Sequence, residues 1–340
     1  MITTQFIDTP SLRVHYRHAG HQGNPPVLLV HGFPQDSYMW RHQMEVLAAH
    51  YDVYAPDTRG YGLTDKPRVR VTRDILADDM VEFIDAVGLD EVYLVGHDWG
   101  GIIAFKAAID HPDRFTKLAL IDTLTSVWSP RGIHGWWFKC EPQADDFWAQ
   151  HAVEFIRAVF AGEKGSYGPP PYSPWARSDD SASGARLWDP TRTWTAADVD
   201  HYVAMFDNEA SWFHAVEYYR HALPFHRLHQ DGTFEFLSNP KVAALWERNE
   251  FEHMVYAPED WHKSYPHPAL WLFSPFLIPQ AFASGMPDDD YEPSGDLYAE
   301  SFPRHFPDLR VRGALCGHFV PEEDPARTNE VLTDFFAARI

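Results

Sequence analysis

The stretch VGHDWGG, residues 95–101, decides the fold. It ends the apolar run 91–96 and leads into a helical pattern, so it predicts a sharp turn between a strand and a helix. Small residues around Asp98 allow strand and helix to approach while the central side chain is exposed above the sheet edge. The start of the helix adds free N–H groups and a positive end, which favour an ionised carboxylate. The alternative interpretation of Asp98 is an ordinary helix N-cap.

Short apolar runs recur on both sides of this turn and alternate with helical patterns. Their apolarity is continuous, which is typical of strands buried on both faces of a mostly parallel sheet. Residues 73–88 carry apolar side chains at helical spacing between two such runs, and residues 1–20 alternate as a strand does. The apolar runs are 25–30, 51–56, 91–96, 117–122, 268–273 and 310–315.

The alternation lapses over residues 124–266, a region rich in Trp, Tyr, His and Pro. Helical patterns there flank residues 165–184, whose Gly, Pro and Ser content predicts a loop. We therefore expect an α/β protein in two parts. Residues 1–123 and 267–340 form the core domain, and residues 124–266 form a mostly helical cap inserted into it.

Composition narrows the class of protein. A hydrophobic content of 45% over 340 residues supports a folded globular chain, and a formal net charge of -21 argues against nucleic acid or an anionic membrane as partner. Two cysteines, Cys140 and Cys316, are too few for a disulfide framework. No run reaches the roughly 20 apolar residues of a membrane span, and the first residues lack a signal-peptide pattern. We expect a soluble cytoplasmic protein, and the sequence leaves a homodimer open.

A second turn supports a catalytic function for Asp98. The sequence His31-Gly32-Phe33-Pro34 follows the strand 25–30 and predicts a turn beside the Asp98 turn. The backbone N–H groups of Phe33 and Trp99 can together form a two-donor oxyanion hole.

A base and an orienting acid are expected after the nucleophile in chain order. His318 follows the strand 310–315 and precedes an acidic run, which makes it the predicted base. The end of the strand 268–273 offers no carboxylate, whereas Asp122 ends the strand after the Asp98 helix and is the predicted acid. A capping role for Asp122 is the alternative. The run Asp288, Asp289 and Asp290 is a fallback that, like Lys106, is more typical of solvated surface.

Five motifs in order resemble the α/β-hydrolase superfamily, in the branch with an aspartate nucleophile: HGFPQDSYMW, PDTRGYGLTDKP, VGHDWGG, HPDRFTKLALID and GHFVPEEDP. Epoxide hydrolases and fluoroacetate or haloalkane dehalogenases belong to that branch. The resemblance implies an α/β-hydrolase fold with a helical cap.

An aspartate nucleophile indicates an alkyl substrate rather than an acyl one. Serine attacking a saturated carbon would leave a stable ether, whereas aspartate leaves an ester. Water activated by His318 can hydrolyse that ester at the Asp98 carbonyl, while the oxyanion hole holds the developing charge and Asp122 steadies the imidazolium.

The resemblance also suggests the substrate. VEYYR, residues 216–220, is similar to the tyrosine-arginine motif of epoxide hydrolase caps and makes Tyr219 the acid that assists the departing oxygen. The segment GIHGWWFKCEP offers His134, Trp136 and Trp137 as substrate-binding residues, with core packing as the alternative. The leading hypothesis is an epoxide hydrolase that takes a neutral hydrophobic small molecule and water.

Two rival hypotheses remain. A haloalkane or haloacid dehalogenase would use the same three residues, with Trp99, Trp136 and Tyr219 around the halide. Fluoroacetate dehalogenases carry arginines where this chain has Trp99 and Ile102, which disfavours a haloacid. The other rival is a ligand-binding protein on a hydrolase scaffold without activity. We expect no cofactor, and the cap histidines lack a metal-ligand pattern, so we expect no metal.

Overall fold

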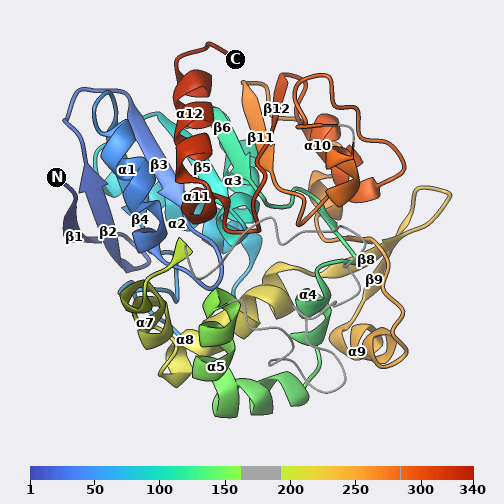
Figure 1. Ribbon diagram of the computed structural model, residues 1–340. Helices are drawn as coiled ribbons and strands as arrows, with labels where there is room; N and C mark the ends of the chain where they lie inside the picture. The colour runs from blue at the N-terminus through green and yellow to red at the C-terminus, as the bar shows by residue number, and fades with distance from the viewer. Residues whose placement is uncertain (162–192, 284) are drawn as a thin grey trace. The chain divides into compact units, whose positions relative to one another are not determined.

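The computed structural model describes residues 1–161, 193–283 and 285–340, so the loop predicted over 165–184 lies outside the described residues (Figure 1). The chain divides into two compact units. Unit 1 comprises Met1–Asp65, Arg73–Ser126 and Glu259–Ile340, and unit 2 comprises Lys66–Thr72 and Val127–Pro258. The domain limits expected from sequence, 123/124 and 266/267, stay predictions.

Unit 1 is built on an eight-stranded, mostly parallel sheet, which confirms the predicted fold class. The strand order is β1-β2-β4-β3-β5-β6-β11-β12, and only the β1–β2 and β2–β4 pairs are antiparallel. The four central strands are buried along nearly their whole length, as their continuous apolarity predicts. The strands are β1 Thr3–Asp8, β2 Arg13–Ala19, β3 Pro26–Val30, β4 Asp52–Pro56, β5 Val92–His97, β6 Phe115–Ile121, β11 Ala269–Phe273 and β12 Leu309–Gly313.

Helices of unit 1 flank this sheet. In Figure 1, α1, α11 and α12 lie together in front of it, and α2 pairs with α3 behind it. The helix predicted over 73–88 is α2, and α3 follows the Asp98 turn. The helices are α1 Arg41–Leu47, α2 Arg73–Ala86, α3 Trp99–Asp110, α10 Leu297–His305, α11 Val320–Glu323 and α12 Pro325–Phe336, with short 3₁₀ turns at Ser37–Trp40 and Pro279–Phe282.

Unit 2 contains helices and a small antiparallel sheet of order β7-β10-β8-β9. The sequence predicted the helices but not the sheet, because strands of two to four residues are too short to show a period of two. The helices are α4 Ile133–Trp137, α5 Gln143–Ala161, α7 Ala196–Ala204, α8 Glu209–Glu217, a π-helix Tyr218–Ala222 and α9 Asn239–Glu247. The strands are β7 Val127–Trp128, β8 Phe225–Leu228, β9 Phe234–Leu237 and β10 Met254–Val255.

Over the described ranges, every helix is too short or too polar to span a lipid bilayer. In the same ranges, no cluster of three or more His, Cys, Asp or Glu side chains is suited to hold a metal ion. Cys140 and Cys316 are both buried free thiols.

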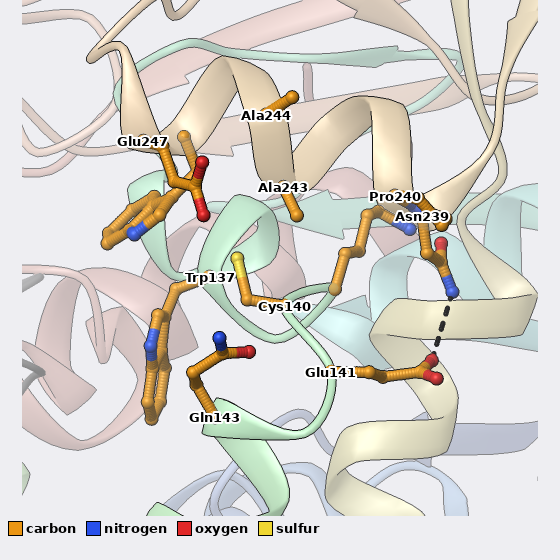
Figure 2. A pocket seen from close by; sticks show the side chains of 11 residues that line it. Trp137, Cys140, Glu141, Gln143, Asn239, Pro240, Ala243, Ala244 and Glu247 are labelled. Carbon is orange, nitrogen blue, oxygen red and sulfur yellow. Dashed lines mark hydrogen bonds between the residues drawn. The ribbon is translucent and has the colours of Figure 1, made fainter.

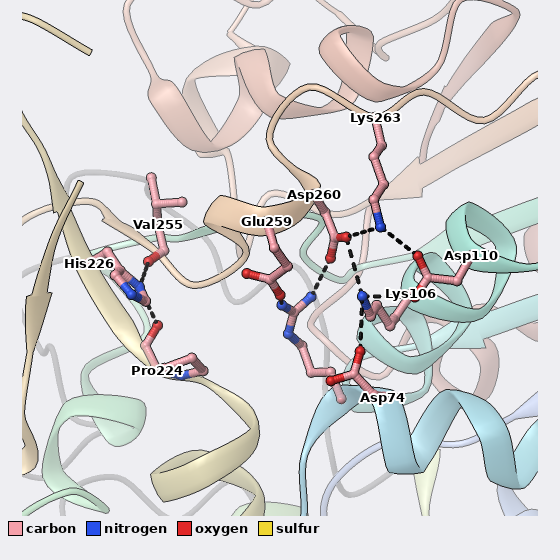
Figure 3. A network of polar contacts seen from close by, with 10 residues as sticks. Asp74, Lys106, Asp110, Pro224, His226, Val255, Glu259, Asp260 and Lys263 are labelled. Atoms are coloured by element: carbon pink, nitrogen blue, oxygen red, sulfur yellow. Dashed lines mark hydrogen bonds and ion pairs between the residues drawn. The ribbon is translucent and has the colours of Figure 1, made fainter. Parts of the chain in front are cut away.

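A buried ion-pair network centres on Asp260, which has no exposed surface (Figure 3). The side chains of Arg73, Lys106 and Lys263 lie 3.0, 3.2 and 2.8 Å from its carboxylate. Lys106 was expected at the solvated surface but is buried, where it pairs with Asp260. Asp260 lies 154 residues further along the chain, so the sequence around Lys106 does not indicate this pair. Burial alone would raise the pKa of Asp260, but the bonds from Lys263 and the neighbouring charges lower it.

Replacing Asp260 with Asn should destabilise the protein by about 3–5 kcal/mol, because three cations would lose a buried counter-charge. The measurement is urea unfolding at neutral pH. The control is Glu250→Gln, which breaks the exposed pair with Arg248 and should change stability by less than about 1 kcal/mol. A D260N variant as stable as the control would contradict this assignment.

Candidate active site

Asp98 occupies the turn between β5 and α3 in a strained backbone conformation, with φ 51° and ψ −122°. The two elements meet so closely that a Cβ atom on Gly96, in β5, would lie 2.2 Å from the carbonyl oxygen of Gly100, in α3. The Asp98 side chain makes no capping hydrogen bond to α3. The geometry therefore does not favour an ordinary N-cap.

Two backbone donors converge on the Asp98 carboxylate. The Phe33 N–H donates to Oδ1 at 2.7 Å, and the Trp99 N–H also bonds to the carboxylate. Gly32 makes this approach possible, because a Cβ atom there would lie 2.5 Å from Asp98 Oδ1. The two N–H groups expected to form an oxyanion hole thus lie at the carboxyl group itself.

His318 and Asp122 complete a connected line of three side chains. His318 Nε2 lies 3.3 Å from Asp98 Oδ2, and His318 Nδ1 lies 2.6 Å from Asp122 Oδ2. The second oxygen of Asp122 accepts bonds from the N–H and the hydroxyl of Ser274, at 2.8 and 2.9 Å. The structure therefore brings together the three residues that the sequence singled out.

The fallback acids lie elsewhere. Asp289 accepts hydrogen bonds from the Val311 N–H at 2.8 Å and from the guanidinium of Arg312 at 2.7 Å. These bonds fasten the loop 288–290 to β12.

The charges of the site depend on one another. Burial alone would lower the pKa of His318, but its bonds to Asp122 and Asp98 raise it to about 10. Burial alone would raise the pKa of Asp98, but the bond and charge of His318 bring it below the usual range. Burial raises the pKa of Asp122, while the bonds from His318 and Ser274 oppose that rise. The two carboxyl groups beside His318 therefore favour the protonated form of its ring.

The loop carrying His318 is fastened by residues that sequence reasoning missed. Glu323, at the end of α11, accepts the N–H groups of Gly317 and Phe319 at 2.6 and 2.8 Å, one on each side of His318. The buried His97, which precedes the nucleophile, donates from Nε2 to the His318 carbonyl at 2.9 Å. Burial raises the pKa of Glu323 to about 7, against the effect of these two N–H groups.

The neighbouring Glu322 reaches the other side of the site. It is buried and accepts hydrogen bonds from the side chains of Gln35 and Arg41. Gln35 closes the Phe33 turn through its N–H to the Gly32 carbonyl, at 2.9 Å. The only signal in the sequence was the acidic run after His318, which gives no indication of these partners.

The remaining predicted residues lie in unit 2. Tyr219 is buried in the π-helix, and its ring contacts those of Phe138, His134 and Trp128 at 4.7, 5.3 and 6.0 Å between centroids. Of the three predicted substrate-binding residues, His134 therefore lies beside Tyr219. The roles of all four remain predictions.

Trp136 and Trp137 have different surroundings. Trp136 is buried against Phe225 and Phe251, at 5.1 and 5.5 Å between ring centroids. Trp137 packs edge-on against Phe147 at 4.7 Å and borders a cavity of about 350 Å³ in unit 2 (Figure 2). The cavity is also lined by Lys139, Cys140, Glu141, Gln143, Asn239, Pro240, Ala243, Ala244, Trp246 and Glu247.

Comparisons with known proteins give consistent results. The family model described as "alpha/beta hydrolase fold" matches residues 25–325. An epoxide hydrolase of Caballeronia sordidicola is 35% identical over 252 residues, which cover 68% of this chain and 75% of that protein. Epoxide hydrolase A of Mycobacterium tuberculosis is 42% identical over 122 residues, or 35% of this chain and 38% of that protein.

The human protein Epoxide hydrolase 4 is 43% identical over 118 residues, or 34% of this chain and 33% of its own length. The chain thus aligns with little more than a third of the human and mycobacterial relatives. A solved structure of the epoxide hydrolase CorEH matches the whole of both chains with a TM-score of 0.71 at 21% identity, which bears on the fold alone. From the family match, the aligned relatives and the fold, we conclude that the chain belongs to the α/β-hydrolase family, in its epoxide-hydrolase-like branch.

Proposed function

We propose that this protein is an epoxide hydrolase that opens a neutral, hydrophobic epoxide through a covalent ester on Asp98. The observation that carries the proposal is the pair of N–H donors on the Asp98 carboxylate, whose Oδ1 accepts from Phe33 while Oδ2 faces His318. An aspartate in this position can bond to a saturated carbon and still be released by hydrolysis.

In the first step, Asp98 Oδ2 attacks an epoxide carbon and the ring C–O bond breaks. The departing oxygen takes a proton, for which the proposed donor is Tyr219. Oδ1 keeps its bond from the Phe33 N–H and becomes the carbonyl oxygen of the ester. A neutral substrate suits the site because Trp99 and Ile102 stand where a carboxylate-binding branch of the family has arginines.

In the second step, His318 takes a proton from water, and the resulting hydroxide attacks Cγ of Asp98. Negative charge then develops on Oδ1, which already accepts the Phe33 N–H, and the Trp99 N–H bonds to the same carboxyl group. Collapse of this intermediate breaks the ester C–O bond, and the departing alkoxide takes a proton from the His318 imidazolium to give the diol. The Asp98 carboxyl group then loses its proton, which restores the carboxylate, and the Tyr219 phenolate regains a proton. Asp122 keeps Nδ1 protonated, so that Nε2 faces Asp98 as the base.

Ester formation should also change the basicity of His318. The anion of Asp98 helps to raise the pKa of His318, and that charge disappears when the ester forms. A lower pKa lets the imidazolium lose its proton, which prepares it to act as a base in the second step.

Replacing His318 with Gln should trap the ester, because the first step remains while hydrolysis slows by about 10³-fold or more. Incubation with styrene oxide followed by intact-mass measurement should add the full mass of the epoxide. Trapping with an alkyl bromide would instead add the alkyl group and release bromide, which is the dehalogenase outcome. Asp98→Asn is the control without a nucleophile. An H318Q variant that binds epoxide yet never gains mass would refute the covalent route.

Replacing Asp122 with Asn should lower kcat by about three to four orders of magnitude, because the imidazole loses its orienting acid. Ser274→Ala is the matched control, since it removes only the hydroxyl bond to Asp122 and leaves the Ser274 N–H bond in place. Steady-state assay of diol formation measures both. If D122N retained wild-type turnover, another acid would have to be the partner of His318.

NMR titration of the His318 ring should give a pKa near 10 in the unmodified protein. In Asp98→Asn the value should fall, because one of the two stabilising anions is lost. His318 therefore contributes stability that is complete below about pH 6.5 and declines as pH rises towards 10. His305, whose pKa is lowered chiefly by burial, is the internal control. An unchanged titration of His318 in D98N would contradict the charge coupling.

A further inference from the structure

The segment that carries Tyr219 is a π-helix, a wider turn than the α-helix α8 that precedes it. In a π-helix each carbonyl bonds to the N–H five residues later, so the carbonyl of Tyr219 faces position 224. That position is Pro224, which has no N–H. Because this segment is buried, the Tyr219 carbonyl needs another donor to avoid the cost of an unsatisfied group.

Lys139 supplies that donor. Its Nζ bonds to the carbonyl oxygen of Tyr219 at 2.5 Å and to that of Leu223 at 2.6 Å. The side chain is 1% exposed, and its ammonium lies over the Phe225 ring, 4.4 Å from the centroid. One buried lysine therefore donates hydrogen bonds to two carbonyl groups at the end of the helix that carries Tyr219, the proposed acid.

A second cation makes the reciprocal contact. Arg220 Nε donates to the carbonyl of Phe138 at 2.8 Å, and its two terminal nitrogens bind the Asp145 carboxylate at 2.8 and 2.6 Å. Residues 138–139 and 219–220 thus exchange cation–carbonyl bonds, and the Phe138 ring packs 4.7 Å from that of Tyr219. Both backbone and ring of Tyr219 are held from the same short segment.

Burying a lysine side chain costs free energy, because its charged group loses its hydration. Burial, together with the nearby charge of Arg220, lowers the pKa of Lys139 to about 7. An apolar side chain of similar length would avoid that desolvation. The role of Lys139 must therefore lie in its N–H donors.

We propose that Lys139 is a positioning residue that sets the backbone of Tyr219 by replacing the N–H that Pro224 lacks. The inference rests on the proposed function for the acid role of Tyr219, but the contact itself lies wholly within unit 2. Loss of Lys139 should let the end of the π-helix shift, so that the Tyr219 hydroxyl no longer meets the departing epoxide oxygen. Hydrolysis of the ester would not need it, because His318, Asp122 and the two N–H donors belong to unit 1.

Single-turnover kinetics with styrene oxide tests the kinetic part of this proposal. In Lys139→Met, ester formation should slow by about 10–100-fold, while hydrolysis of the formed ester stays within about twofold of the unmodified rate. Lys139→Arg should recover much of the loss, because a guanidinium offers several N–H donors and the side chain borders the cavity of Figure 2. Lys241→Met, at an exposed lysine of the same unit, should behave as the unmodified protein.

A second variant tests the missing N–H directly. Adding Pro224→Ala to K139M restores a donor at position 224 and should recover part of the rate of ester formation. Hydrogen exchange of the amides of residues 219–223 should quicken in K139M, but not in K241M, and should slow again in the double variant. Unchanged exchange in K139M, or equal slowing of both chemical steps, would overturn the proposal.

Tyr219→Phe separates this inference from the proposed function. If Y219F forms the ester at the unmodified rate, the acid role of Tyr219 fails, and the exchange measurement alone decides whether Lys139 holds the helix. If K139M does not fold, exchange in K139R and in Pro224→Ala decides. In P224A the new N–H at position 224 can bond to the Tyr219 carbonyl alongside Lys139, so slower exchange of the amides of residues 219–223 supports the proposal. Faster exchange of these amides in P224A contradicts the proposal.

Discussion

The site depends on the closeness of β5 and α3. A side chain at Gly96 would meet the Gly100 backbone, and Asp98, in the turn between these two glycines, has a positive φ. That conformation takes the carboxylate away from a capping position and directs it to the N–H groups of Phe33 and Trp99. Strain at a single residue thus places the carboxylate of the proposed nucleophile against two backbone N–H donors.

The reacting groups are held by the ends of neighbouring strands and by one short helix. Phe33, Asp98 and Asp122 follow β3, β5 and β6, which are adjacent in the sheet, as expected for a ligand site at the carboxyl ends of parallel strands. The helix α11 then links two of these groups, since Glu322 contacts the side of the Phe33 turn and Glu323 fastens the His318 loop. A shift of α11 would therefore move the base and the oxyanion donors together.

Much of unit 1 could be predicted from the sequence, because its signals are local. Continuous apolar runs mark the buried strands, and the Asp98 turn and the order of Asp98, Asp122 and His318 are visible in short motifs. Lys106 could not be placed, since a charged side chain on a helix looks solvated until its partner Asp260 is brought to it by the fold. The same holds for Glu322, whose partners Arg41 and Gln35 lie 281 and 287 residues away.

Unit 2 was predicted less completely for a related reason. Its strands are too short to show a period, and its π-helix depends on a lysine that lies 80 residues earlier in the chain. Aromatic residues there gave no indication of which side chains contact Tyr219, because such residues serve packing and binding equally well. His134 proved to be its neighbour, whereas Trp136 and Trp137 pack elsewhere.

The main segment of unit 2 leaves the sheet after β6 and returns before β11, two strands that pair directly with each other. The two ends of this segment meet in the small sheet, where Val127 pairs with Val255, so its length imposes no change on the pairing of β6 with β11. Such an insert can be shortened or replaced as a unit without changing the strand order of the main sheet, but the proposed proton donor Tyr219 belongs to it. Evolution and protein engineering can therefore vary this insert in length and sequence while the eight-stranded sheet keeps its order.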